Sequence, residues 1–156
     1  MQQYDEHITL ITPDAPLNAA THGGRAKCLQ RLVRLALPVP RTLALSFHMV
    51  RRIAAGDVPD ATTLLAPFKD NAVLCVRPSS EDPDWGGPGA ALNIGMNDEN
   101  HAELARHIGK AAASELYLRC VQAFAIHVAR LDPETFEDVP DDPIEGLKQA
   151  LEAYED

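Results

Sequence analysis

The chain has 156 residues, of which 46% are apolar and 24% charged, so one globular domain with a hydrophobic core is expected rather than a disordered or membrane-embedded chain. Its net charge of −9 is concentrated in residues 131–156, where ten acidic residues stand against one base, Lys148. Residues 1–130 balance thirteen acids with thirteen bases, which argues against nucleic-acid binding as the main role.

Cysteine usage and the N-terminus indicate a cellular compartment. Cys28, Cys75 and Cys120 are odd in number and form no Cys-X-X-Cys pair, which favours buried free thiols in a reducing environment. No basic segment followed by a long apolar stretch is present, so neither a secretory signal nor a membrane span is predicted. We therefore expect a cytoplasmic protein without a membrane partner.

Short apolar runs and helical periodicity predict a mixed α/β chain. Between Gly24 and Ala36, apolar residues recur every three or four positions, which predicts an amphipathic helix entered through Gly23-Gly24 and ended by Pro38-Val39-Pro40. The expected elements of the first half are a strand at 7–12, the helix at 24–36, a buried strand at 42–47, a helix capped by Ser46 and reaching residue 55, and a short helix at 61–68. Those of the second half are a buried strand at 72–76, a long loop at 78–91, a strand at 92–96, helices at 99–108 and 111–130, an acidic Pro-rich linker at 131–143, and a helix at 143–154.

The glycine pair before the first long helix is a candidate anion site. A helix N-terminus offers unpaired N–H groups, two glycines permit close approach, and Arg25 and Lys27 add positive charge, a combination that attracts phosphate. The segment lacks the spacing and the Gly-Lys-Ser/Thr ending of a Walker A loop. The alternative is a simple turn flanked by solvated bases.

Arg77 is the second candidate, because it follows the predicted strand at 72–76 and opens a Gly-rich loop. An arginine placed there can hold an anionic ligand with two hydrogen bonds, or it can pair with Glu81 or Asp82. The loop also carries Trp85, either in a mobile lid or in a rigid surface connection. Taken alone, Arg119 is an ordinary exposed or paired helix residue.

The remaining signatures predict no catalytic residue and no metal site. The chain has no Gly-X-Ser-X-Gly elbow and no His-Glu-X-X-His motif, and His101 with His107 does not match a usual zinc pair. Most of the six histidines are therefore expected at the surface.

Three blocks, in the same order, resemble the ATP-binding domain of pyruvate phosphate dikinases and the related phosphoenolpyruvate synthases. The first matches a Gly-Gly-Lys-Gly turn and a helix ending in Leu-Gly-Leu-Pro-Val-Pro, through Gly23, Gly24, Leu29, Arg34, Leu35, Leu37, Pro38, Val39 and Pro40. The second matches a Val-Arg-Ser strand, a Gly-rich loop and a Leu-Asn-Leu-Gly-Leu-Asn-Asp ending, through Val76, Arg77, Gly86, Leu92, Asn93, Gly95, Asn97 and Asp98. The third matches a Tyr-Arg-Arg-Phe-Ile-Gln helix through Tyr117, Arg119 and Gln122.

The resemblance implies the helix-rich N-terminal subdomain of an ATP-grasp-like fold, with a small sheet, in a transferase of the kinase type. Such enzymes convert ATP, pyruvate and phosphate to phosphoenolpyruvate, AMP and diphosphate through a phosphohistidine on another domain. ATP with Mg²⁺ is the implied cofactor. The implied binding residues are Gly23, Gly24, Arg25, Arg77, Gly86 and Arg119.

The resemblance also implies a division of the chain, with a partial nucleotide-binding domain over 1–130 and an acidic linker and helix over 131–156 that lead to further domains. Those domains would belong to a longer chain or to a separate partner chain, and the piece is not expected to turn over alone. Arg25 stands where the family has lysine, Ala26 where it has glycine, and Glu81 where dikinases have arginine. These departures favour the alternative, a non-catalytic regulatory or interaction module that kept the fold and lost ATP chemistry.

Overall fold

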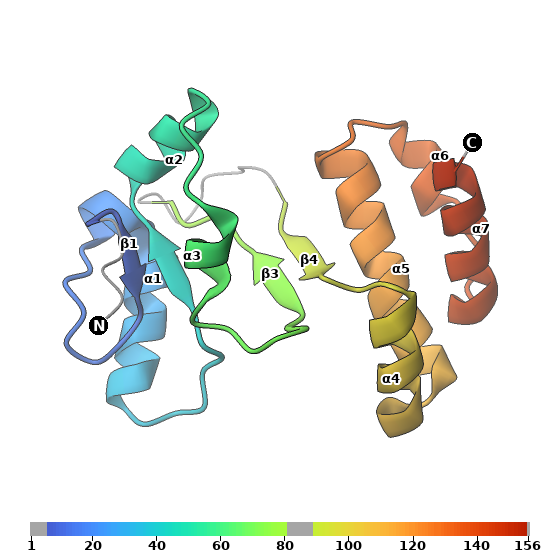
Figure 1. The fold of residues 1–156 in the computed structure, drawn as a ribbon, viewed down its shortest axis with the longest axis horizontal. Coiled ribbons are helices and arrows are strands. Elements are labelled where there is room, and N and C mark those ends of the chain that lie inside the picture. Colours follow the sequence, from blue (N-terminus) through green and yellow to red (C-terminus); the bar gives the residue numbers. More distant parts are fainter. Residues whose placement is uncertain (1–5, 81–88, 156) are drawn as a thin grey trace. The chain divides into compact units, whose positions relative to one another are not determined.

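A computed structural model describes residues 6–80 and 89–155 and divides the chain into two compact units. The first unit comprises Met1–Lys69 and Pro78–Gly87, and the second comprises Asp70–Arg77 and Pro88–Asp156. The chain therefore crosses between the units three times, and each unit is built from segments distant in sequence (Figure 1).

The first unit combines a two-stranded antiparallel sheet with helices. Strand β1 pairs with β2, so that Ile8 lies opposite Leu45 and Leu10 opposite Leu43. Ser46 follows β2 directly, and its side-chain oxygen accepts a hydrogen bond from the Met49 N–H, so it begins the next helix as predicted. The elements of this unit are β1 (Ile8–Leu10), α1 (Ala19–Arg34), β2 (Leu43–Leu45), α2 (Phe47–Ala54) and α3 (Ala61–Leu65).

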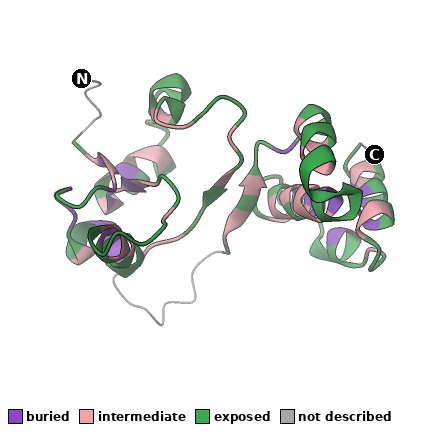
Figure 2. Ribbon diagram, turned by 90° about the horizontal axis from the view of Figure 1, so that it is seen from below, coloured by how far each residue is buried: buried purple, intermediate pink, exposed green. Residues whose placement is uncertain are grey.

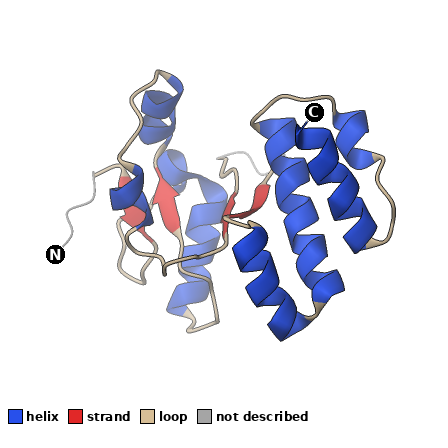
Figure 3. Cartoon of the chain, turned by 45° about the vertical axis from the view of Figure 1, so that its right-hand side comes forward, coloured by secondary structure: helices blue, strands red, loops and turns tan. Residues whose placement is uncertain are grey.

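The second unit is a two-stranded antiparallel sheet packed on helices (Figure 3). Strands β3 and β4 are antiparallel, with Leu74 opposite Ile94 and an irregularity in register before Val76. Helix α5 lies between β4 and α7 and contacts both. The elements of this unit are β3 (Leu74–Val76), β4 (Ala91–Ile94), α4 (Asp98–Ile108), α5 (Lys110–His127), α6 (Pro133–Glu137) and α7 (Pro143–Glu155).

Each unit has its own core, and Figure 2 shows the buried residues as separate purple segments within each unit. Both cores use small and branched aliphatic residues, as expected for a chain with 5% aromatic residues. The first core consists of Ile11, Ala15, Leu17, Ala26 and Ala44, with Leu29 and Val33 packed against it. The second consists of Leu118, Val121, Ala125, Phe136, Leu147 and Ala150.

The predicted elements are present, and the mixed α/β class is confirmed at this level. The boundaries between the two units, however, lie after residues 69, 77 and 87, and not at residue 130. Within the acidic segment, Phe136 of α6 and Leu147 of α7 pack against Leu118 and Val121 of α5. The segment predicted as a linker thus contains the short helix α6, begun by Asp132, whose side chain accepts from the Glu134 N–H.

Two expectations about burial are wrong. The strand predicted as buried at 72–76 exposes Cys75 and Val76, and Val76 is 61% exposed, because β3 has only one partner strand among the described residues. Cys28 is exposed on α1, where the buried stripe passes through Ala26 and Gln30 instead. Cys120 is half-buried, and all three cysteines are free thiols.

Candidate functional site

The glycine turn is a real break in α1. Gly23 has φ +81° and ψ 165°, so α1 consists of a first turn ending at His22 and a main segment over 24–34. A side chain at position 23 would be strained by this backbone and would overlap Ser79. Glycine is therefore required at this position both by its backbone conformation and by the approach of a distant segment.

That segment, Ser79 and Ser80, closes the start of the main helical segment, and we call it the serine cap. The Gly24 N–H donates to the Ser80 carbonyl at 2.7 Å, and the Ala26 N–H donates to Ser79 Oγ at 3.2 Å. The Ser79 hydroxyl in turn donates to the His22 carbonyl at 2.7 Å. Two of the amides expected to face a phosphate are thus hydrogen-bonded to the chain itself.

The basic residues of α1 divide into two groups. Lys27 Nζ donates to the Leu17 carbonyl at 3.1 Å, and Arg34 Nε donates to the Pro13 carbonyl at 2.7 Å, so both hold the loop after β1. Arg25 and Arg31 are exposed, and neither side chain forms a hydrogen bond or ion pair with another residue in the described part of the chain. Arg25 is therefore an available cation in the first turn of the main helical segment.

The other predicted binding residues lie in the second unit or outside the described residues. Arg77 directly follows β3, is exposed, and has no ion pair within residues 6–80 and 89–155. Gly86, Trp85 and the alternative partners of Arg77, Glu81 and Asp82, lie outside the described residues.

Arg119 lies on α5, also in the second unit, and its guanidinium is paired. Its Nη2 lies 3.0 Å from Glu115 Oε1, one helical turn away, and its side chain is 57% exposed. This pairing agrees with the interpretation of Arg119, taken alone, as an ordinary exposed or paired helix residue. An anionic ligand at Arg119 would compete with the Glu115 carboxylate.

His22 is a feature that the sequence did not identify, since surface histidines were expected. It is only 7% exposed; its Nδ1 lies 2.8 Å from Thr21 Oγ1, and its Nε2 has no hydrogen-bond partner within the described residues. Burial lowers the pKa of His22, and this outweighs the opposing effect of a backbone hydrogen bond at Asn18. A neutral imidazole thus stands directly before the glycine turn.

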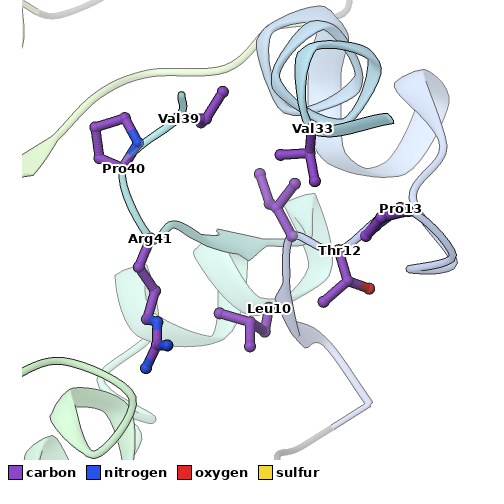
Figure 4. Close-up of a pocket in the computed structure, with 8 residues that line it drawn as sticks. Leu10, Thr12, Pro13, Val33, Val39, Pro40 and Arg41 are labelled. Carbon is purple, nitrogen blue, oxygen red and sulfur yellow. The ribbon is translucent and has the colours of Figure 1, made fainter. Parts of the chain in front are cut away.

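A pocket of about 480 Å³ lies elsewhere in the first unit, between the end of β1, Val33 of α1 and the segment Val39–Arg41 (Figure 4). Its lining is largely apolar. The guanidinium of Arg41 extends away from Val33 and Pro13, and its Nη1 donates to the Pro67 carbonyl at 2.6 Å. The pocket therefore offers little polar chemistry and is no substitute for the glycine turn.

Comparison with known proteins adds no assignment: no protein-family model matches the chain, and no curated protein matches it. Within residues 6–80 and 89–155, no three histidine, cysteine or acidic side chains form a group able to hold a metal ion. None of the helices in the described ranges has the length and apolar character needed to cross a membrane.

Proposed function

We propose that this chain is the ATP-binding portion of a phosphotransferase similar to pyruvate phosphate dikinases, and that it does not turn over alone. The observation that carries the proposal is Arg25, whose exposed guanidinium, in the first turn of the helical segment opened by Gly23-Gly24, has no ion pair within residues 6–80 and 89–155. Arg77, exposed directly after β3, belongs to the second unit, so the proposal rests on Arg25.

In this proposal, the phosphates of a nucleotide are bound by an arginine side chain rather than by backbone N–H groups at the start of the helix. A guanidinium matches phosphate oxygens with charge-assisted hydrogen bonds. The Gly24 and Ala26 amides do not fit in the same way, because they already donate to Ser80 and Ser79. Mg²⁺, which enters as the complex with ATP, would offset phosphate charge, and the transfer chemistry belongs to further domains.

Titration calorimetry of the full chain with Mg-ATP tests this proposal. We expect Arg25→Gln to weaken binding about tenfold, the loss typical of one charge-assisted hydrogen bond. Arg31→Gln is the matched control, because Arg31 is also exposed and unpaired on α1 within the described part, and its loss changes the net charge equally. Equal affinity of the two variants for Mg-ATP would refute the role of Arg25.

The serine cap favours a second candidate, a non-catalytic interaction module that lacks ATP chemistry. Its hydrogen bonds give two amides at the helix start, those of Gly24 and Ala26, neutral partners, and Ala26 stands where the family has a glycine. For this candidate, the expected result is no heat of binding with Mg-ATP in the wild-type chain while the fold is retained.

A further inference from the structure

We propose that the second unit carries a docking groove for a helix that is apolar on one face and basic on the other. The groove has a volume of about 480 Å³ and is formed within this unit by β4, α5 and α7. It is independent of the glycine turn and of the proposed nucleotide chemistry.

Exposed apolar side chains converge on this groove. The groove is lined by Leu92 and Ile94 of β4, Phe124 of α5, Val128 at the C-terminal cap of α5, and Tyr154 of α7. Their exposed fractions range from 36% for Leu92 to 57% for Val128. Such a cluster of large apolar side chains is costly to leave in water and is typical of an interaction site.

The shape of the groove favours an elongated occupant. Its lining follows α5 from Tyr117 to the capping residue Val128, which at the helical rise per residue is about 16 Å, or three turns. A helix of three turns presents apolar side chains at positions i, i+3 or i+4, and i+7, which suits a groove of this length.

The net negative charge of the second unit favours a basic partner. The unit contains fifteen acidic and six basic residues, whereas the first unit has eight of each. At one end of the groove, Asp98 accepts a hydrogen bond from the Tyr117 hydroxyl at 3.4 Å. Two turns along α5, the Phe124 ring contacts Tyr154, which the exposed Glu155 follows.

Asp98 therefore lies at the Tyr117 end of an apolar surface, the exposed Glu155 follows Tyr154 in the sequence, and Glu115 offsets the charge of Arg119 on α5. A second copy of this unit would bring a net charge of −9 against another −9, which opposes self-association. Lysines or arginines flanking the apolar face of a partner helix complement this surface and steer its approach.

The test is fluorescence anisotropy with the full chain and synthetic helical peptides of about three turns. The first peptide has leucines on one face and lysines elsewhere; the second replaces lysine with glutamate; the third scrambles the order. We expect the basic amphipathic peptide to bind at least about tenfold more tightly than either other peptide, and added salt to weaken it.

Phe124→Ser tests the location, with Ile108→Ser as the matched control. Both side chains are 46% exposed and lie in the second unit, but Ile108 is outside the groove. We expect an approximately tenfold loss of peptide affinity for Phe124→Ser only. Val128→Ser provides a second groove variant, and circular dichroism melting checks that each variant is folded.

Three outcomes would overturn the proposal. Equal binding of the basic and acidic peptides would indicate an apolar site without charge selection. Equal binding of the scrambled peptide would indicate electrostatic attraction alone. A dimer in sedimentation experiments that dissociates in Phe124→Ser would identify a second copy as the occupant.

Discussion

The two units stabilise their folds by different means. The first places His22, Gln30 and Ser46 among its buried residues and closes α1 with the serine cap, whereas Ser114 is the buried polar residue of the second unit within the described ranges. The second unit relies on apolar packing of α5, α6 and α7 and carries the whole net charge. Buried hydrogen bonds thus add to the apolar core of the first unit, whereas the second unit depends mainly on apolar packing.

The largest expected effect is on the apolar core of the second unit. Phe136 is 2% exposed and packs against α5, so Phe136→Ala removes a ring from a filled core and is expected to cost about 4 kcal/mol of unfolding free energy. Hydrogen exchange should show lost protection in α5–α7 and retained protection in α1. Met49→Ala, at a side chain with 0% exposure in the first unit, is the counterpart and should show the reverse. Uniform loss of protection across both units would contradict the division.

The second largest effect is expected at the glycine turn of α1. Gly23→Ala is expected to lower the unfolding free energy by about 3 kcal/mol, because a Cβ adds both backbone strain and overlap with Ser79. Gly56→Ala is the control, since Gly56 has φ +92° and open space around it. The difference between the two variants in denaturant titrations isolates the overlap with the serine cap. If the two variants lose equal stability, the cap contributes nothing at this position.

A smaller effect is expected from the buried amide that holds the loop after β1. Gln30 is 0% exposed, and its Nε2 donates to the Ala15 carbonyl at 2.6 Å and to the Thr12 carbonyl at 3.2 Å. Gln30→Leu removes the hydrogen bonds of Gln30 with these carbonyls and with Lys27 Nζ, and is expected to lower the unfolding free energy by about 2 kcal/mol. Chemical denaturation measures the loss, and Cys28→Ala, at an exposed position on the same helix, should cause little change.

These differences between the units explain which features of the fold could be predicted from the sequence and which could not. Helices such as α1, α5 and α7 have a local signal in their apolar spacing, and α7 also begins at Pro143 with Glu145 in its first turn. The bounds of α5 and α7 lie close to the predicted ones, whereas α1 begins at Ala19, before the predicted start at residue 24. The serine cap has no local signal, because Ser79 and Ala26 are 53 residues apart in sequence. The burial of Gln30 and His22 likewise depends on long-range packing, which a polar residue in an amphipathic pattern does not reveal.

The smallest expected effect is a pH dependence confined to the first unit. Because burial lowers the pKa of His22 below the ordinary histidine value of about 6.5, the unfolded chain binds a proton more readily than the folded one. The contribution of neutral His22 is therefore fully present above about pH 6.5 and is lost as the pH falls through the lowered folded value. In the charged ring both nitrogens carry a proton, and the proton on Nε2 has no acceptor among the described residues.

Denaturant titrations of the wild-type chain and His22→Asn between neutral and mildly acid pH measure this effect. The wild type should lose more stability than the variant over this interval, because asparagine does not titrate. His48→Asn is the control, since His48 is an exposed histidine of the same unit, with its ring centroid 4.3 Å from that of His7. Hydrogen exchange should locate the acid-induced loss at the glycine turn, because the His22 carbonyl accepts the Ser79 hydroxyl. An acid-induced loss of protection centred on α5 would instead show that a group of the second unit, and not His22, causes the pH dependence.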